Sequence, residues 1–356
     1  MQKLQLKVKS IIPQTDQAIQ VIFEQPEQER LAYKAGQFLT FLLNIEGEEF
    51  RRAYSLCSSP FANEPPSVAI KRVAEGKVSN FLNDTLKEGY TLTSLPPKGV
   101  FTTDLSAHQK RHFVFFAGGS GITPIFSLLK SVLLVEKESK VSLIYANRNI
   151  HSIIFKQDLE QWQQQYANRF QMIHILEQAP SLSWQYPTGY LTPEMIKELL
   201  AQLPQMNIRD TEYFMCGPAP MMQIIEQSFV QLGIPKEKLR KENFALSPEE
   251  SAQGIESQTN ILTTTSDFLV TIHYEGLTHQ VIVKPTQTIL EAALKQGIQL
   301  PYSCQSGLCT ACMGKCIQGK VKLDEEDALT PKELEQGYIL TCVGHPLTPN
   351  VVIEID

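Results

Sequence analysis

The chain has 356 residues, of which 42% are hydrophobic and 20% are charged, and its net charge is −6. This length exceeds one ordinary domain, so we expect two or three, and the composition is that of a globular protein. An acidic balance lacks the basic footprint of nucleic-acid binding, which favours small-molecule and protein partners. No apolar run reaches membrane-spanning length and no apolar signal core begins the chain, so we expect a cytoplasmic protein without a membrane partner.

The first hundred residues are expected to form an antiparallel β-barrel. Short runs of β-type residues alternate with breaks rich in Gly, Pro, Asn and Glu, which is the pattern of a barrel of short strands. The expected strands are 4–12, 18–25, 37–45, 51–59, 67–73 and 91–97.

One of these strands carries the sequence Arg52-Ala53-Tyr54-Ser55. The two-residue period of a strand places Arg52 and Tyr54 on one face and Ser55 on the other. A guanidinium beside an aromatic ring suits a ligand that has both a pyrophosphate and a flat ring. Taken alone, the pattern is also ordinary strand chemistry.

A second candidate follows in the segment KRVAEGKVSNFLND, residues 71–84. Gly76 and Ser79 are predicted to open a helix over 79–89, whose N-terminal amides can accept a phosphate. Ser79 is equally well explained as a simple helix N-cap. The two candidate segments therefore carry more weight together than either does alone.

From about Arg111 the pattern changes to alternating strands and helices, which predicts a parallel α/β domain. The expected strands are 112–117, 140–148, 170–176 and 211–218, and the expected helices are 125–137, 155–166 and 192–203.

Two loops of this α/β region are candidate nucleotide-binding turns. Gly118, Gly119 and Gly121 fall between the first strand and its helix, where bare backbone lets a dinucleotide pyrophosphate reach a helix N-terminus. Pro124 replaces the third glycine of the usual motif, and a cluster of glycines can also be just a tight turn. The segment 216–218, Cys-Gly-Pro, ends a later strand at the edge where open α/β sheets bind ligands.

The end of the second α/β strand bears on nucleotide choice. An NAD site usually places an acid there, but this strand ends in Asn147 and Arg148. A guanidinium can hold a 2′-phosphate through two hydrogen bonds, which favours NADPH. The alternative is that Arg148 is a solvated residue and that the site accepts NADH as well.

The last part of the chain is expected to be a small mixed α/β unit. Residues 246–266 are polar and without a sustained period, so we interpret them as a linker. A hairpin over 267–285, a helix over 288–297 and a final strand over 351–356 follow. The acidic run 324–327 either faces a partner protein or is a solvated loop.

Four cysteines in this unit have the spacing of an iron–sulfur site. Cys304, Cys309 and Cys312 form C-x4-C-x2-C, and Cys342 is the distant fourth. A plant-type [2Fe–2S] cluster takes three thiolates from one loop and one from a separate element. A four-cysteine zinc site more often shows two C-x2-C pairs, although a zinc knuckle or a set of buried thiols is the alternative.

Two glycines of the same segment also fit a cluster loop. Gly307 and Gly314 have no side chain that would keep backbone N–H groups away from the inorganic sulfurs. We therefore expect both glycines to belong to the loop that surrounds the cluster.

The remaining cysteines are Cys316, Cys57 and Cys216. Cys316 follows the motif closely, and we expect it to be a small buried hydrophobic residue rather than a ligand. Two cysteines outside the motif region imply no disulfide framework.

In this order, and over nearly the whole chain, the motifs resemble the ferredoxin-NADP reductase superfamily. The similar branch carries a C-terminal plant-type ferredoxin domain and includes phenylacetyl-CoA epoxidase reductases and related oxygenase reductase components. The resemblance implies an FAD-binding β-barrel (1–105), an NAD(P)-binding α/β domain (106–245), a linker (246–266) and a β-grasp ferredoxin domain (267–356). It also implies FAD, a [2Fe–2S] cluster and NADPH or NADH.

The resemblance implies roles for individual residues, with Ser55 and Cys216 as the catalytic pair. For FAD it implies Arg52 on the pyrophosphate, Tyr54 stacked on the isoalloxazine, Ser55 near the reactive nitrogen, Gly76, Val78 and Ser79 in the phosphate turn, and Phe244 on the other flavin face. For the nucleotide it implies Gly119, Gly121, Thr123, Cys216, Gly217 and Pro218, with Thr123 and Cys216 beside the nicotinamide, whereas Arg148 is expected there on the ground of its charge. Lys71 is a further expected cofactor-binding residue.

The combination of modules has a chemical reason. A nicotinamide gives up two electrons as a hydride, a [2Fe–2S] cluster takes one electron at a time, and a flavin can exchange both ways. We therefore expect an NAD(P)H oxidoreductase that passes single electrons to an acceptor protein such as a multicomponent oxygenase. The alternatives are a reductase of ferredoxin, flavodoxin or a hybrid-cluster protein, and an electron-carrier module on a non-catalytic scaffold.

Overall fold

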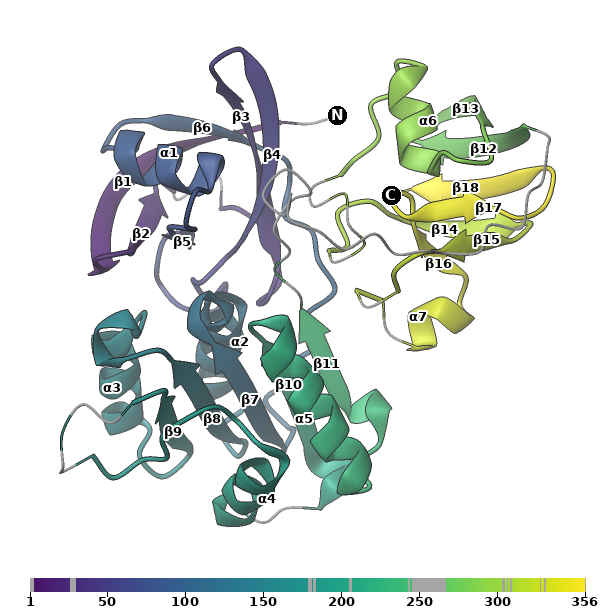
Figure 1. Ribbon diagram of the computed structural model, residues 1–356. Helices are drawn as coiled ribbons and strands as arrows, with labels where there is room; N and C mark the ends of the chain where they lie inside the picture. The colour runs from purple at the N-terminus through teal and green to yellow at the C-terminus, as the bar shows by residue number, and fades with distance from the viewer. Residues whose placement is uncertain are drawn as a thin grey trace. The chain divides into compact units, whose positions relative to one another are not determined.

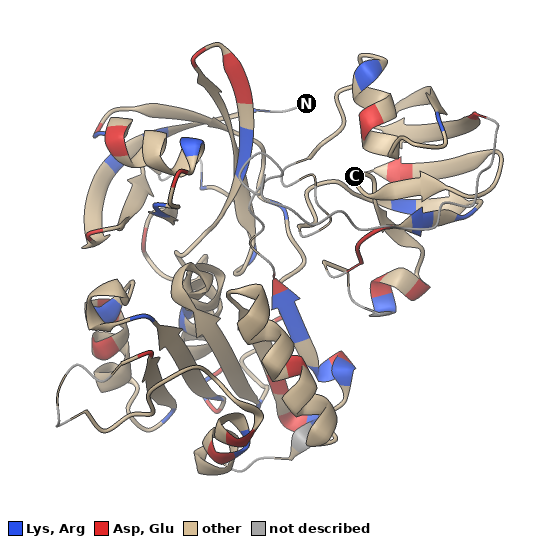
Figure 2. Cartoon of the chain, in the orientation of Figure 1, with Lys and Arg blue, Asp and Glu red and all other residues tan. Residues whose placement is uncertain are grey.

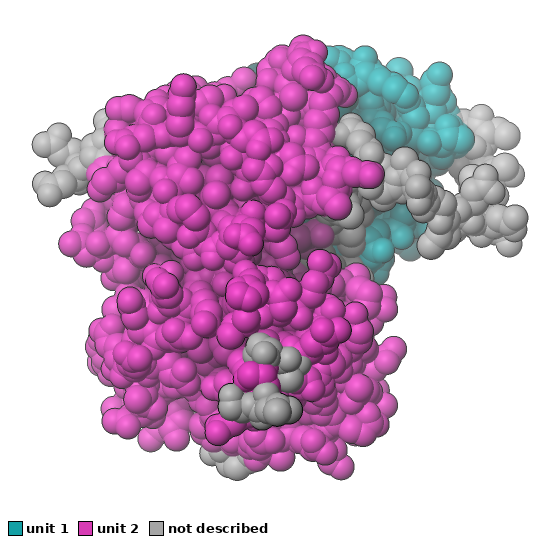
Figure 3. All heavy atoms as spheres, turned by 60° about the vertical axis from the view of Figure 1, so that its left-hand side comes forward, with its two compact units in different colours: residues 1, 245–356 teal, residues 2–244 magenta. Residues whose placement is uncertain are grey.

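The chain divides into two compact units, residues 2–244 and residues 245–356 together with residue 1, which are coloured separately in Figure 3. The computed structural model describes residues 3–25, 30–178, 181, 184–204, 207–242, 244, 267–302, 305, 307, 309–326, 328–329 and 331–355. Among these residues no helix is long and apolar enough to cross a membrane.

The first unit begins with a curled antiparallel sheet of six strands in the order β4-β3-β6-β1-β2-β5 (Figure 1). The strands are β1 (Leu4–Thr15), β2 (Ala18–Phe23), β3 (Phe38–Ile45), β4 (Glu48–Ser55), β5 (Ser67–Lys71) and β6 (Thr91–Ser94). Alternate side chains such as Leu6 and Val8 of β1 enter a common core with Val21 and Phe23 of β2. The predicted barrel is therefore confirmed.

The helix that follows β5 starts and ends earlier than predicted. Helix α1 spans Lys77–Thr85 with Gly76 at its N-cap, so residues 86–89 of the expected helix lie outside it. Ser79 is consequently not an N-cap, because it lies inside the first turn with its hydroxyl buried. The backbone turns away at Leu86, the C-cap, whose extended ψ ends the helix.

The second part of this unit is a parallel sheet in the order β11-β10-β7-β8-β9. Its strands are β7 (His112–Gly118), β8 (Lys140–Asn147), β9 (Phe170–Leu176), β10 (Thr211–Cys216) and β11 (Leu239–Glu242). Its helices are α2 (Ile122–Val135), α3 (Lys156–Gln165), α4 (Pro193–Gln202) and α5 (Ala219–Gln231), with short turns η1 (Gly119–Gly121), η2 (Ile150–Ser152), η3 (Ile208–Asp210) and η4 (Lys236–Lys238).

This strand order places a topological switch point between β7 and β10, the position where open α/β sheets bind ligands. Every residue of β7 is buried, because helices cover both faces of a parallel sheet. The predicted α/β domain is confirmed. Helix α5 and strand β11 were not anticipated from the sequence.

The C-terminal unit contains a five-stranded mixed sheet in the order β13-β12-β18-β14-β16 and a separate pair, β15-β17. Its strands are β12 (Phe268–Tyr274), β13 (Leu277–Val283), β14 (Met313–Gln318), β15 (Val321–Leu323), β16 (Tyr338–Leu340), β17 (Gly344–Pro346) and β18 (Val351–Ile355), and its helices are α6 (Ile289–Lys295) and α7 (Pro331–Glu335). The predicted hairpin turns at Glu275 and Gly276, both with positive φ, as a tight two-residue turn requires.

Candidate functional site

Strand β4 ends at the junction between the barrel and the α/β sheet. The Ser55 hydroxyl donates to Glu242 Oε2 at 3.3 Å, which joins the end of β4 to the end of β11. Glu242 lies opposite Cys216 in the parallel pair β10-β11. Three side chains that are far apart in the sequence thus gather at one point.

Burial raises the pKa of two of these groups. Burial of its carboxyl end raises the pKa of Glu242 from 4.5 to about 8, although the Ser55 hydrogen bond opposes the shift. Burial, and then the nearby Glu242, raise the pKa of the Cys216 thiol well above its usual value. Glu242 therefore holds a proton at neutral pH, and Cys216 stays a thiol.

The glycine turn after β7 packs directly against the turn after β10. A Cβ on Gly121 would lie 2.0 Å from the Cys216 carbonyl oxygen, and one on Gly118 would lie 2.6 Å from Pro218 Cδ. No side chain fits at either position, so the two loops approach backbone to backbone. This close approach brings the predicted nucleotide residues of both loops together.

Two more predicted nucleotide residues have defined surroundings. Gly119 has a φ of +52°, which favours glycine, and its carbonyl accepts from the buried Tyr145 hydroxyl at 3.0 Å. Thr123 is buried in the first turn of α2, where its hydroxyl donates to the Ser120 carbonyl. The turn is therefore held in one conformation from two sides.

Lys71 brings a cation to the same turn, and the charge of Arg148 acts on it. Lys71 ends β5 of the barrel, and its Nζ would lie 3.4 Å from a Cβ on Gly119. Burial, and then the charge of Arg148, lower the pKa of Lys71. The two cations repel each other, and an anion bound near both would offset that repulsion.

On strand β4 the predicted flavin residues are partly exposed. Arg52 and Tyr54 are half-buried and Ser55 is buried, but Ala53, on the face of Ser55, is half-buried too, so the burial pattern does not test the expected alternation. The Tyr54 ring packs against Phe41 of β3 with centroids 5.4 Å apart. The strand thus offers a guanidinium and a supported aromatic ring.

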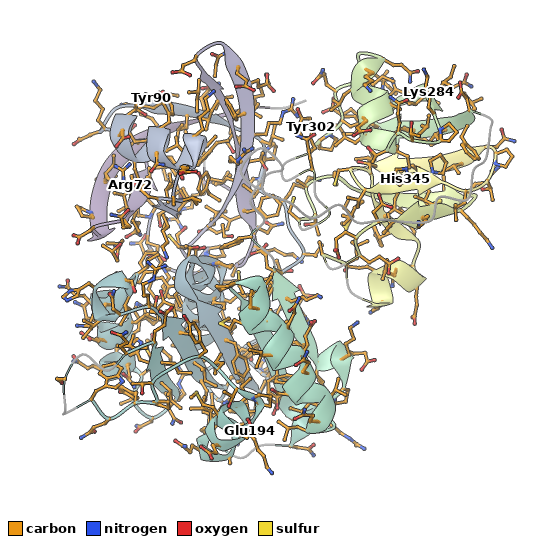
Figure 4. All side chains as sticks on the ribbon, viewed as in Figure 1. Arg72, Tyr90, Glu194, Lys284, Tyr302 and His345 are labelled. Carbon is orange, nitrogen blue, oxygen red and sulfur yellow. The ribbon has the colours of Figure 1, made fainter. Side chains whose placement is uncertain are left out.

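The turn before α1 is held by polar contacts. The Ser79 hydroxyl accepts from the Val73 amide at 3.0 Å, and Asn80 donates to the carbonyls of Val73 and Gly76. Arg72, labelled in Figure 4, bonds Asp84 at 2.6 Å. These contacts fix the start of the helix, with Val78 buried beneath it.

The tip of the β3-β4 hairpin is acidic, as Figure 2 shows, and Lys77 at the start of α1 pairs with it. The Lys77 ammonium lies 3.0 Å from Glu48 and 3.7 Å from Glu46. This contact ties the helix start to strand β4, which carries Arg52.

Phe244 is the last described residue of the first unit, and 44% of its surface is exposed. An exposed phenylalanine next to Glu242 is available to cover a flat ligand. Its expected place against the flavin stays a prediction.

In the C-terminal unit, two predicted cluster ligands are brought together by neighbouring strands. Cys312 precedes β14 and Cys342 follows β16, and both are buried. The Cys312 carbonyl accepts from both the amide and the hydroxyl of Thr341, at 3.1 Å each. Cys309 is half-buried, and Cys304 lies outside the described residues.

The surroundings fit a cluster loop. Gly307 has a φ of +74°, and a Cβ there would lie 2.7 Å from Glu325 Cβ, so the loop needs glycine. Three thiolates from one loop and a fourth from a separate element are the donor set of a plant-type [2Fe–2S] cluster, and Cys309 and Cys312 precede β14 while Cys342 follows β16. Among the described side chains alone, no three metal-ligating groups form a site.

Two expectations about this region need correction. Gly314 is expected in the cluster loop, but a Cβ there would lie 2.9 Å from the Ile353 and Ile355 side chains, so its small size serves packing against β18. Cys316 lies on β14 as a half-buried rather than buried residue, with its thiol 3.3 Å from the Gln318 carbonyl.

Glu242 is a site residue that the sequence alone does not reveal. It begins the short segment ENFAL, residues 242–246, but a single acid in such a segment shows no sign of burial. Its contact with Ser55 spans 187 residues, and only the fold reveals it.

Family models match all three parts of the chain. An oxidoreductase FAD-binding domain covers residues 3–103, an oxidoreductase NAD-binding domain covers 115–227 and a 2Fe-2S iron-sulfur cluster binding domain covers 272–347. Together with the fold, these matches define an iron–sulfur flavoprotein oxidoreductase.

Two curated relatives match over almost their whole length. The ferredoxin reductase component of 3-ketosteroid-9-alpha-monooxygenase from Rhodococcus rhodochrous is 34% identical over 98% of this chain and 96% of its own. One component of the 1,2-phenylacetyl-CoA epoxidase from Escherichia coli (strain K12) is 33% identical over 99% of this chain and 97% of its own.

Solved structures share the fold. Phthalate dioxygenase reductase aligns over 99% of this chain and 98% of its own with a TM-score of 0.58 and 20% identity. An intact type IV self-sufficient cytochrome P450 monooxygenase aligns over 99% of this chain and 41% of its own, with a TM-score of 0.71 and 20% identity. The chain belongs to the family of FAD-, NAD- and 2Fe-2S-dependent ferredoxin reductase components, and it is an oxidoreductase that uses FAD, a pyridine nucleotide and a [2Fe–2S] cluster.

Proposed function

We propose that this protein oxidises NADPH and delivers single electrons through its [2Fe–2S] cluster to the oxygenase component of a multicomponent system. The observation that carries the proposal is the junction of Ser55, Cys216 and Glu242, where the FAD-binding and NAD-binding parts meet. The relatives support the choice of acceptor, since they are named as components of a monooxygenase and an epoxidase.

When bound, FAD would accept the hydride as an electron pair and allow one-electron transfer onward. The residues at the junction hold and place a proton. The Ser55 hydroxyl donates to Glu242, and the raised pKa keeps that carboxyl protonated at neutral pH. Ser55 is therefore proposed to position the edge of the flavin. The protonated carboxyl of Glu242, which accepts from the Ser55 hydroxyl, is proposed to hold a proton beside it.

Cys216 has a different proposed role. Its buried thiol stays uncharged, so it is not a nucleophile. The Cys216 carbonyl packs against Gly121, and this contact fixes the backbone surface on which the nicotinamide would lie. Thr123 would lie beside the nicotinamide. Cys216 thus shapes the site, and the Gly217-Pro218 backbone completes the turn.

The phosphates have two proposed sites. Arg52 and the turn of Gly76, Val78 and Ser79 would hold the FAD pyrophosphate, since a half-buried guanidinium and a helix N-terminus suit an anion. Lys71, with Gly119 and Gly121, would hold the pyrophosphate of the nucleotide.

The preference for NADPH rests on Arg148. The residue is exposed directly after β8, where Asn147 replaces the usual acid, and its charge adds to that of Lys71. Ser152 is less suited to bind a phosphate, because its hydroxyl is already bonded to Asn149 in a capping box.

The cluster would be held by Cys304, Cys309, Cys312 and Cys342. The proposed cytoplasmic location is supported by the cysteine pattern, because closely spaced cysteines in a cytosolic protein more often bind a metal than form disulfides. The domain bounds 1–105, 106–245, 246–266 and 267–356 also remain a proposal.

The acceptor is tested by competition. The NADPH-reduced protein is mixed anaerobically with an oxygenase component, a ferredoxin and a flavodoxin at equal concentrations, and the reduction of each is followed. We expect the oxygenase component to be reduced fastest. Faster reduction of ferredoxin or flavodoxin would replace this proposal with a ferredoxin or flavodoxin reductase.

A further inference from the structure

A largely buried polar cluster joins the barrel to helix α2 through residues that are not assigned above to cofactors. From the barrel it contains Ser58, Ser59 and Glu64, in the loop between β4 and β5, and from α2 it contains Ser127, Lys130 and Ser131. We call these six residues the domain seam. None of them belongs to a cofactor motif named above.

The contacts across the seam are short and specific. Lys130 Nζ lies 2.5 Å from Glu64 Oε1, and the Ser127 hydroxyl donates to the Ser58 carbonyl at 2.5 Å. The hydroxyls of Ser59 and Ser131 are 2.7 Å apart. Successive turns of α2 thus bond to one barrel loop.

Most of the seam is buried, although the Glu64 side chain is 32% exposed. Lys130 is only 3% exposed, and Ser58, Ser127 and Ser131 are fully buried. A buried ammonium is unfavourable unless its charge is matched, and Glu64 matches it while also accepting from the Ser59 amide at 2.7 Å. The Lys130 ammonium also lies 4.4 Å from the centre of the Phe126 ring. Because these bonds are directional, α2 cannot slide along the barrel without breaking them.

The two sides of the seam are connected to the two proposed cofactor sites, the flavin site at Ser55 and the nicotinamide site at the glycine turn. On the barrel side, Ser58 follows Ser55 by three residues, and Ser55 ends β4 at the junction. On the other side, α2 starts directly after the glycine turn that packs against Cys216. A shift of α2 along its axis would move that turn relative to Ser55 by about the same distance.

We propose that Lys130, through Glu64 and the serine contacts, is a positioning residue that sets the distance between the bound nicotinamide and the flavin. Hydride transfer depends steeply on this distance, and a misplacement of about 1 Å can cost roughly a hundredfold in rate. The inference rests on the proposed NADPH-to-FAD transfer. The inference predicts that Lys130 alters the rate of hydride transfer although it contacts neither the nicotinamide nor the flavin.

The test is the anaerobic reduction of the flavin by NADPH in the full-length holoprotein, measured by stopped flow. Lys130→Met keeps the length of the side chain and removes its charge. We expect its limiting rate of flavin reduction to fall at least about tenfold, while the dissociation constant for NADPH stays within about twofold. Lys130→Arg, which restores the cation, should recover part of the rate.

A matched control separates positioning from stability. Arg111 is another largely buried cation of the same unit, and it pairs with Glu136 and Glu212 at the opposite end of the parallel strands. Arg111→Met should lower the melting temperature but leave the limiting rate per bound flavin unchanged. An equal loss of rate in both variants would overturn the proposal, since it would show a general effect of destabilisation.

If Lys130→Met does not fold, the double variant Lys130→Met, Glu64→Met replaces the pair with apolar side chains, a change that often preserves folding. The double variant lacks the directional bond between Lys130 and Glu64, so its limiting rate of flavin reduction should also be low. A native limiting rate in either folded variant would refute the positioning role. If the unmodified protein itself fails to oxidise NADPH, the proposed function fails instead, which keeps the two failures distinct.

Discussion

Glu242→Gln tests the protonation of the junction. Glutamine resembles the protonated carboxyl in shape, and its amide oxygen can still accept from Ser55. The native pKa is raised from 4.5 to about 8, so the folded protein binds this proton more tightly than the unfolded chain does. The stability that Glu242 contributes is therefore complete below about pH 4.5 and is lost as the pH rises through about 8.

The shift sets the expected magnitude. At about 1.4 kcal/mol per pKa unit, the stability that Glu242 loses between low and high pH has an upper limit of about 5 kcal/mol. Glu242 is only partly buried as a residue, so solvent screening reduces this, and we expect about 2 kcal/mol. For a unit of this size, that corresponds to a difference of about 4–8 °C in melting temperature.

The assay compares thermal unfolding of the two proteins at about pH 5.5 and about pH 8.5, with flavin fluorescence as the signal. The unmodified protein should lose more stability than the glutamine variant between these values, so the variant should be the more stable one at the higher pH. Glu237→Gln, which changes an exposed carboxylate in η4, is the control and should behave as the unmodified protein does. Parallel pH profiles for the glutamine variant at position 242 and the unmodified protein would refute the assignment of a buried, protonated carboxyl.

Other outcomes follow from the remaining sites. Cys342→Ser should abolish the cluster absorbance and leave FAD bound, whereas Cys316→Ala should keep the cluster; loss of the cluster in the latter would make Cys316 a ligand. A truncated chain ending at Leu246 should fold, bind FAD and reduce an artificial two-electron dye with NADPH, and a failure to retain flavin would show that the boundary is wrong. Arg148→Ala should raise the KM for NADPH about tenfold or more, a loss of about 1.4 kcal/mol, with little change for NADH. Equal kcat/KM values for the two nucleotides in the unmodified protein would contradict the preference.

The sequence predicted those features that depend on local pattern. We could predict the glycine turn at 118–121, the strand with Arg52 and the order of the three domains. Each has a signature in the sequence: a short motif, a hydrophobic period or a fixed spacing of cysteines. The start of helix α1 at Lys77 could not be predicted, because Ser79 has the residue type of an N-cap. Only the structure shows that Ser79 is buried inside the first turn.

What escaped prediction depends on contacts between distant segments. Glu242 has no motif of its own, and its raised pKa comes from burial at the junction with Ser55. Lys130 lies in a helix that looks simply apolar in sequence, although the fold places it against Glu64 of the barrel. Such pairings appear only when the barrel and the α/β sheet are seen packed together.

The central claim is that electrons from NADPH reach the cluster through the flavin. It is tested by titrating the full-length protein with NADPH under anaerobic conditions, following flavin absorbance together with the electron paramagnetic resonance signal of the reduced cluster. The flavin should bleach and the cluster signal should grow in the same titration, and Cys342→Ser should show the bleaching without the signal. Bleaching of the flavin in the unmodified protein while the cluster stays oxidised would contradict the account.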